Sequence, residues 1–284
     1  MIFENKNYEE ERALYHLSNS EVYHCQFKGK MDGESPLKEC EGIKVKDCFV
    51  NLRYPFWHNQ NLILSDSILK ENSRAPLWYC HQVKIENVQC DGIKAIRESS
   101  DIQILHSTFN SEEFGWKSSH LFIQDSNFVG PYFLLDTKDV TMVNSTLQGK
   151  YSFQYMKNVR VENCTLNTKD AFWHSKDVVV MNSFLKGEYI GWYSDNLTFI
   201  NCKIQGTQPF CYCKNLKLLN CELIDADFAF ENSKVNATLN GKVISIKNPL
   251  KGQIYIQGEL GEMILQDCIH KTKAKVFVNH KKVN

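Results

Sequence analysis

Aromatic side chains that could bind a saccharide recur at one position of a repeating sequence. All five tryptophans stand five residues before a regularly spaced apolar residue, and each is followed by a residue with a polar tip. Such rings offer large apolar faces, so a row of them suits stacking on sugar rings or aromatic ligands. The candidate ligand-binding residues on this face are Trp57, His58, Arg74, Trp78, Arg97, Trp116, Lys117, Trp173, Trp192 and Tyr193.

Carboxyl groups near this face could add catalysis. Glycoside hydrolysis uses two carboxyls roughly 5–10 Å apart across a bound sugar, and Asp170 and Glu188 occupy similar places in adjacent repeats. Glu113 is a further carboxyl, and His174 could serve as a general acid or base. A repeat protein with charged faces also brings such groups together by accident, so the sequence leaves catalysis open. It contains no Gly-rich phosphate loop, Gly-x-Ser-x-Gly segment or His-Glu-x-x-His segment.

The elements that position these residues follow from one nearly constant spacing. Apolar anchor residues recur every 19 residues, with a single step of 21 between Leu62 and Val83. Self-similarity at this period is typical of a solenoid, in which each unit buries its apolar face against its neighbours. The anchors are Ile43, Leu62, Val83, Ile102, Leu121, Val140, Val159, Val178, Leu197, Leu216 and Val235.

Within one repeat the pattern predicts strands. Leu197 and Phe199 alternate with polar residues, which is the signature of a strand with one buried face. The unit is too short for two helices and a turn, and its turns do not match the consensus of leucine-rich repeats. We therefore predict an all-β fold, a parallel β-helix with about 19 residues per coil and two or three short strands in each coil.

A polar residue stands four positions after most anchors. Asn tolerates the left-handed backbone conformation and bonds nearby backbone, so this column predicts the bend between two strands. Stacked at roughly 4.8 Å per coil, the amides can bond along the column as a ladder. The column contains Asp47, Asp66, Asn87, His106, Asp125, Asn144, Asn163, Asn182, Asn201 and Asn220.

The residue before each tryptophan predicts where its ring points. Where that residue is apolar, strand alternation turns the ring outward, which applies to Trp57, Trp78 and Trp173. Where it is glycine, we expect the ring to point inward together with the apolar residue two positions earlier; these pairs are Phe114 with Trp116 and Ile190 with Trp192.

A second interpretation of the tryptophan face is structural. Trp and Tyr rings would pack along the column as a ladder, with Arg97 stacked between Trp78 and Trp116 through cation–π contacts. An exposed apolar strip would also suit a protein partner or a contact between copies of the chain.

Composition narrows the class of protein. Lys plus Arg equals Asp plus Glu, at 33 each, so no overall field favours nucleic acid or an anionic membrane. The apolar runs are too short to span a bilayer, and the N-terminus lacks a secretory segment. Eleven cysteines, an odd number, fall largely at buried repeat positions without zinc-site spacing. We therefore expect free thiols, a cytoplasmic location, and no metal or cofactor.

The ends of the chain are expected to cap the solenoid, which would otherwise expose raw strand edges. We predict an N-terminal cap over residues 1–39, β-helix repeats over 40–240, and C-terminal strands and a cap over 241–284. The N-terminal cap would contain a short amphipathic helix at Asn7–Leu17, a first strand at Glu21–Phe27 and a turn at Gly33–Glu39. After Asn240 the register fails, which predicts shorter, irregular strands at Val243–Ile246, Ile254–Ile256, Met263–Leu265 and Val276–Val278, followed by a frayed end at Asn279–Asn284.

The sequence resembles the pectin-lyase-like superfamily of single-stranded right-handed β-helices and, more closely, an uncharacterised bacterial family of unknown function with that fold. The resemblance implies a right-handed helix and no established activity. Pectate lyases and polygalacturonases of the superfamily carry calcium-binding aspartates, an Asp-Asp pair or a Gly-His-Gly segment, none of which is evident here, so no catalytic residue transfers. The segments that carry the resemblance are 33–39, 54–57, 191–194, 206–213 and 245–249.

Three hypotheses of function follow. The first is a carbohydrate-related protein that binds or modifies a saccharide along the tryptophan face. The second is a non-catalytic scaffold that uses the same face for a protein partner or for self-association. The third is a metal-dependent lyase or hydrolase.

Overall fold

The computed structural model of the protein describes residues 1–29, 34–268 and 270–284, and these residues form strands and turns without a helix. They divide into two compact units, Met1–Ser145 (unit 1) and Thr146–Asn284 (unit 2). Within each unit, strands pair in parallel with the equivalent strands of the next coil. Each unit is therefore an all-β parallel β-solenoid, which confirms the predicted class. The right-handed sense of winding stays a prediction.

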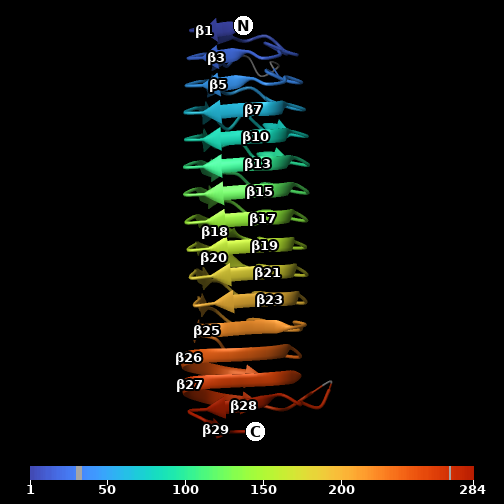
Figure 1. The fold of residues 1–284 in the computed structure, drawn as a ribbon, viewed down its shortest axis with the longest axis vertical. Helices are drawn as coiled ribbons and strands as arrows, with labels where there is room; N and C mark the ends of the chain where they lie inside the picture. The colour runs from blue at the N-terminus through green and yellow to red at the C-terminus, as the bar shows by residue number, and fades with distance from the viewer. Residues whose placement is uncertain (30–33, 269) are drawn as a thin grey trace. The chain divides into compact units, whose positions relative to one another are not determined.

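Unit 1 stacks a row of longer strands, a row of shorter strands and one short extra pair (Figure 1). Anchors pair with anchors, since Val83 lies opposite both Leu62 and Ile102. The long step in the repeat leaves this register intact, because its two extra residues lie between β8 and β9. The longer row is β1 (Ile2–Glu4), β3 (Glu21–Tyr23), β5 (Lys44–Lys46), β7 (Gln60–Ser65), β10 (His81–Glu86), β13 (Ser100–Leu105), β15 (Ser119–Gln124) and β17 (Lys138–Val143). The shorter row is β2 (Asn7–Tyr8), β4 (Gln26–Phe27), β6 (Phe49–Val50), β8 (Ile68–Leu69), β11 (Gln89–Cys90), β14 (Thr108–Asn110) and β16 (Asn127–Val129), and the extra pair is β9 (Leu77–Trp78) with β12 (Ile96–Arg97).

Unit 2 begins with the same two rows and ends in longer strands. The longer row is β19 (Lys157–Glu162), β21 (Lys176–Met181) and β23 (Asp195–Ile200), and the shorter row is β18 (Thr146–Lys150), β20 (Thr165–Lys169), β22 (Phe184–Lys186) and β24 (Lys203–Gln205). The two rows then merge into β25 (Leu216–Ile224), which pairs with both β23 and β24. The last strands are β26 (Lys234–Lys247), β27 (Lys251–Ile264), β28 (Lys275–Val278) and β29 (Lys281–Lys282).

The core of each unit is built from side chains that point inward from successive coils. Strand alternation buries the anchors, and turn residues add rings that stack along the coil axis. In unit 1, Phe114 and Phe133 stack with their centroids 5.3 Å apart. In unit 2, Phe153 and Phe172 stack at 4.8 Å. Each coil therefore buries its apolar surface against the coils beside it, as expected for a solenoid.

The predicted polar column forms the bend after the longer strands. Every member of the column has a positive φ, from 48° at Asn182 to 54° at Asn220, which is the left-handed conformation that Asn and Asp tolerate best. In unit 2 the amides form a ladder: Asn201 donates to Asn182 at 3.1 Å, Asn220 to Asn201 at 2.8 Å, and Asn240 to Asn220 at 2.7 Å. The predicted ladder is confirmed.

Replacing Asn182 with leucine should lower the free energy of unfolding by about 1–3 kcal/mol. The substitution removes the acceptor for the Asn201 amide and places a branched side chain at a φ of 48°. Thermal unfolding followed by circular dichroism measures the loss, with Lys217→Leu at an exposed strand position of the same unit as the control. Equal melting temperatures for Asn182→Leu and the parent would contradict the ladder.

A second polar column, which the sequence analysis missed, lies one residue before the anchors. In unit 2, Asn196 donates to Asp177 at 2.6 Å and Asn215 donates to Asn196 at 3.0 Å. In unit 1, the ring nitrogens of His120 each lie 3.5 Å from a carboxylate oxygen, one of Asp101 and one of Asp139. These residues also have positive φ values, so each longer strand has a polar left-handed bend at both of its ends.

The predicted helix at Asn7–Leu17 is wrong. After β2 the chain forms a turn in which Arg12, Leu14 and His16 have φ values of 54–60°. The N–H of Arg12 donates to Glu34 of the next coil at 2.8 Å, and that of His16 to Lys38 at 3.0 Å. Backbone bonding between coils thus replaces the bonding within the segment that a helix needs.

The coil pattern also reaches further toward the N-terminus than we predicted. The segment Glu21–Phe27 is divided into β3 and β4, and β1 precedes it in the same row, with Ile2 opposite Glu21. Residues 34–39 form the predicted turn, whereas Gly33 lies outside the described residues.

The C-terminal coils continue the solenoid instead of breaking into shorter strands. Lys234 lies opposite Lys251 and Lys247 opposite Ile264, so the parallel register persists with a period of 17 residues. The shorter period hides this register from a search at 19. Positive φ values at Gly241, Gly252 and Gly258 accompany these long strands, where no Asn column supplies the bend.

The predicted frayed end is also wrong. Asn279 and His280 have φ values of 45° and 68°, which suits the two-residue turn of a hairpin. The turn joins β28 to β29 in antiparallel pairing, with Val278 opposite Lys281. The Asn284 side chain accepts from the N–H of Val276 at 2.7 Å.

Candidate functional site

The five tryptophans share one environment on the outer face of the coils. Each indole is half-buried, and its N–H donates to a backbone carbonyl of the next coil. The acceptors are Ala75 for Trp57 at 2.6 Å, Lys94 for Trp78 at 2.8 Å, Tyr132 for Trp116 at 2.7 Å, Tyr189 for Trp173 at 2.6 Å and Gln208 for Trp192 at 2.8 Å. These bonds tie successive coils together.

The prediction that Trp116 and Trp192 point inward is wrong. Gly115 and Gly191 have φ values of 77° and 78°, close to the φ of 60° at Phe172, which precedes the outward Trp173. The backbone conformation is therefore the same whether glycine or phenylalanine precedes the tryptophan, and it sets the direction of the ring.

The indole faces are covered by neighbouring rings. In unit 1, Trp57 and Trp78 stack with their centroids 5.2 Å apart. The Arg97 guanidinium carbon lies 4.9 Å from the ring centroid of Trp78 and 5.6 Å from that of Trp116, as the structural interpretation predicts. In unit 2, Trp173 and Trp192 stack at 5.7 Å. A sugar ring therefore has little open indole face on which to stack.

A second file of rings lies next to the tryptophans. In unit 1, His58 and Tyr79 stack at 4.8 Å. In unit 2, His174 lies between Tyr155 and Tyr193 at 5.1 and 5.2 Å, and Tyr193 stacks on Tyr212 at 4.7 Å. These rings expose mainly their edges, so the aromatic residues predicted to bind a ligand form a structural ladder.

The charged candidates of unit 1 are spread along its surface. Glu113 forms an ion pair with Lys94 at 3.1 Å. Arg74 and Lys117 are exposed, and Arg97 also contacts Glu98 at 3.3 Å. The structure does not bring these groups together into a site.

The polar candidates of unit 2 lie beside a groove that has a floor of glycines. Its volume is about 480 Å³. Gly149, Gly187 and Gly206 stand at one position of the coil, and a Cβ at Gly187 or Gly206 would collide with the backbone of the preceding coil. The absence of side chains at this column opens the groove. The remaining lining residues are Asn167, Lys169, Lys186, Glu188, Gln205, Thr207 and Asp225.

Several polar side chains of this groove have no protein partner. Gln205 holds Asp225 by a hydrogen bond of 2.8 Å, and Thr207 bonds Asp227. By contrast, the side chains of Asn167, Lys169, Lys186 and Glu188 make no hydrogen bond or ion pair within the described part of the chain. An amide, two ammonium groups and a carboxylate are thus available to a ligand.

Asp170 lies at the edge of this groove. Its backbone N–H donates to the carbonyl of Glu188 at 2.9 Å, and the residue is only 6% exposed. Burial raises the pKa of the Asp170 carboxyl; Lys169 partly opposes this rise and the charge of Glu188 adds to it. Of the four catalytic candidates, the structure brings together Asp170 and Glu188, while His174 is held in the file of rings.

The glycine column was the signal that the sequence analysis overlooked. Gly187 and Gly206 are 19 residues apart, and Gly149 precedes Gly187 by two periods. A glycine that recurs at the repeat period marks a position where successive backbones approach closely.

Two further searches concern metals and membranes. Among the residues with described positions, no three His, Cys, Asp or Glu side chains are grouped to hold a metal ion. The same part of the chain contains no helix with the length and hydropathy of a membrane span.

Fold and groove together define an all-β parallel β-solenoid protein with a lateral polar groove. The chain belongs to the family described as Protein of unknown function (DUF3737), whose model matches residues 1–277. This confirms the predicted family of unknown function with a parallel β-helix fold. A search of curated proteins found no match.

Solved structures of other solenoids are similar to this chain at low identity. The surface adhesin PfbA of Streptococcus pneumoniae is 9% identical, with a TM-score of 0.47, over 91% of this chain and 81% of that chain. The catalytic domain of a GH87 alpha-1,3-glucanase in complex with nigerose is 10% identical, with a TM-score of 0.35, over 98% of this chain and 64% of that chain. The A-module of the Azotobacter vinelandii mannuronan C-5 epimerase AlgE6 is 13% identical, with a TM-score of 0.32, over 93% and 73%.

Proposed function

We propose that the protein binds a saccharide in the glycine-floored groove of unit 2. The observation that carries the proposal is the set of unpartnered polar side chains over an open backbone floor. Sugar hydroxyls both donate and accept hydrogen bonds, so they suit a groove that offers amide, ammonium and carboxylate groups. The aromatic ladder supports this site from the side, because Glu188 precedes Tyr189, whose carbonyl accepts the Trp173 indole N–H.

We expect an oligosaccharide that binds this groove to lose affinity about tenfold or more in the Glu188→Gln/Lys186→Gln variant. The variant removes a charged acceptor and a charged donor from the lining without changing the floor. Isothermal titration against a panel of neutral and charged oligosaccharides measures the loss. Tryptophan fluorescence gives a second readout, because the Tyr189 ring lies 5.3 Å from that of Trp192.

Glu259→Gln is the matched control, since Glu259 is an exposed carboxylate of the same unit outside the groove. Silence of the parent across the panel would reject saccharide binding. If the parent also sediments as a dimer and Trp57→Ala/Trp78→Ala as a monomer, the scaffold hypothesis takes its place.

Hydrolysis of the bound saccharide is a second candidate function. The observation that favours it is the raised pKa of the buried Asp170 carboxyl beside the exposed Glu188, since glycosidases pair a protonated carboxyl with an ionised one. Incubation of the parent with the oligosaccharide found by titration, followed by counting of reducing ends, tests this function. A ligand that binds and stays intact would restrict the protein to binding.

A further inference from the structure

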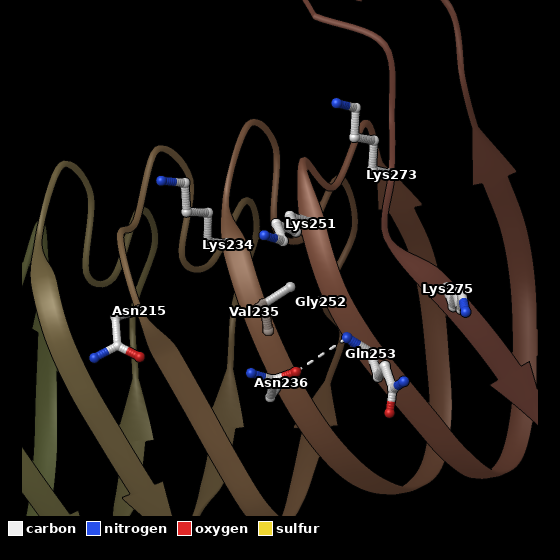
Figure 2. Close-up of a pocket in the computed structure, with 9 residues that line it drawn as sticks. All are labelled: Asn215, Lys234, Val235, Asn236, Lys251, Gly252, Gln253, Lys273 and Lys275. Carbon is white, nitrogen blue, oxygen red and sulfur yellow. Dashed lines mark hydrogen bonds between the residues drawn. The ribbon is translucent and has the colours of Figure 1, made fainter.

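We infer that the C-terminal coils of unit 2 hold a second binding site, a lysine-lined groove for a linear polyanion that carries phosphate or sulfate groups. The groove has a volume of about 460 Å³ and is distinct from the proposed saccharide groove (Figure 2). Its lining residues are Asn215, Lys234, Val235, Asn236, Lys251, Gly252, Gln253, Lys273 and Lys275.

Three of the four lysines occupy equivalent positions in successive coils. Lys234 lies opposite Lys251 in the parallel register of β26 and β27. Gln253 lies opposite Lys275, which places Lys273 one coil after Lys251, and the N–H of Lys273 donates to Leu250 at 2.9 Å. Figure 2 shows the three lysines following one another near the turns, with Lys275 on the strand beside Gln253. The row therefore repeats a positive charge at roughly the 4.8 Å spacing of the coils.

The row replaces a polar ladder that is neutral or acidic elsewhere in the unit. Asp177, Asn196 and Asn215 fill the same column in the preceding coils and are hydrogen-bonded to one another. Where the ladder reaches Lys234, amides give way to ammonium groups that repel each other. An anion bound along the row would relieve that repulsion.

No acidic residue lines the groove, and the four lysines have no carboxylate within 4.0 Å in the described residues. Other lysines of unit 2 are paired across coils. Lys203 contacts Glu222 at 3.4 Å, and Lys247 contacts Glu231 at 3.0 Å. The groove is thus a local excess of positive charge on a chain whose formal net charge is zero.

The floor of the groove favours an anion as well. A Cβ at Gly252 would collide with the Val235 carbonyl, and the φ of 118° there suits glycine. The Asn236 side-chain oxygen accepts the N–H of Gln253 at 3.1 Å, so its NH₂ group remains to donate to a ligand (Figure 2). Lysine ammonium groups with amide donors between them form a phosphate- or sulfate-binding surface.

Binding of fluorescent tripolyphosphate and of a heparin-derived octasaccharide to the full chain tests the inference. We expect the parent to bind at least one probe, with affinity falling as salt rises from about 50 to about 200 mM. Lys234→Gln/Lys251→Gln/Lys273→Gln should weaken binding by about tenfold or more. Binding of tripolyphosphate alone assigns a phosphate chain, and binding of the octasaccharide alone assigns a sulfated saccharide.

The matched control is Lys203→Gln/Lys217→Gln/Lys242→Gln, which removes the same charge from exposed positions of unit 2 outside the groove. Equal weakening in both triple variants, absence of binding at low salt, or tighter binding of a single-stranded oligonucleotide than of either probe overturns the inference. Circular dichroism confirms that both variants fold. The test is independent of the proposed function, because neutral saccharides are directed to the other groove.

Discussion

We expect Phe172→Ala to lower the free energy of unfolding by about 3–5 kcal/mol. The Phe172 side chain is 0% exposed, stacks on Phe153 at 4.8 Å and meets the edge of Phe199 at 6.3 Å. A solenoid coil is stabilised chiefly by its neighbours, so the cavity weakens the contacts of one coil with the next on each side. Urea unfolding followed by circular dichroism measures the loss.

The position of Phe172 makes this effect informative about the fold. Its φ of 60° is unusual for a bulky residue, and the surrounding coils hold it there. Phe228→Ala is the control in the same unit, because Phe228 is 37% exposed and should lose about 1 kcal/mol. Equal losses in the two variants would mean that the stack of inward rings does not hold the coils together.

The fold was predictable because its main determinants are local and repeat. An anchor at every nineteenth position places Leu62, Val83 and Ile102 opposite one another, as the pairing shows. The Asn column was predictable for the same reason, since left-handed backbone at a bend has a clear residue preference. Both features require only one coil to be interpreted correctly.

The errors arose where a contact between coils decides the local structure. The segment Asn7–Leu17 has helical spacing of its apolar residues, but its N–H groups bond to the next coil. The C-terminal strands continue at a period of 17, which an anchor search at 19 misses.

The site was predicted only in part. Sequence patterns identified Asp170 and Glu188, which the structure brings together, and they identified the file of tryptophans. They did not show that the ring faces cover each other, because stacking depends on side-chain conformation. The groove itself is defined by glycines, and a search for chemically active side chains passes over residues that have none.

In the native protein, we expect iodoacetamide at about pH 8 to modify Cys268 far faster than any of the other ten cysteines, by about a hundredfold or more. Ten cysteines are buried and Cys268 is half-buried. Only the thiolate reacts, and burial raises the pKa of Cys80 and Cys90 to about 12 and that of Cys40 to about 11. Mass spectrometry after timed quenching measures the rate at each site.

Cys202 separates the two sources of this protection. A hydrogen bond with Cys221 lowers the pKa of the Cys202 thiol, and burial opposes that shift. Ionisation therefore does not protect Cys202, but its exposure of 1% keeps the reagent away. In about 6 M guanidinium chloride, where the coils are unfolded, all eleven cysteines should react at similar rates. Rapid labelling of Cys202 in the native protein would show that the coils around Cys202 and Cys221 open readily, which contradicts a closely packed stack in unit 2.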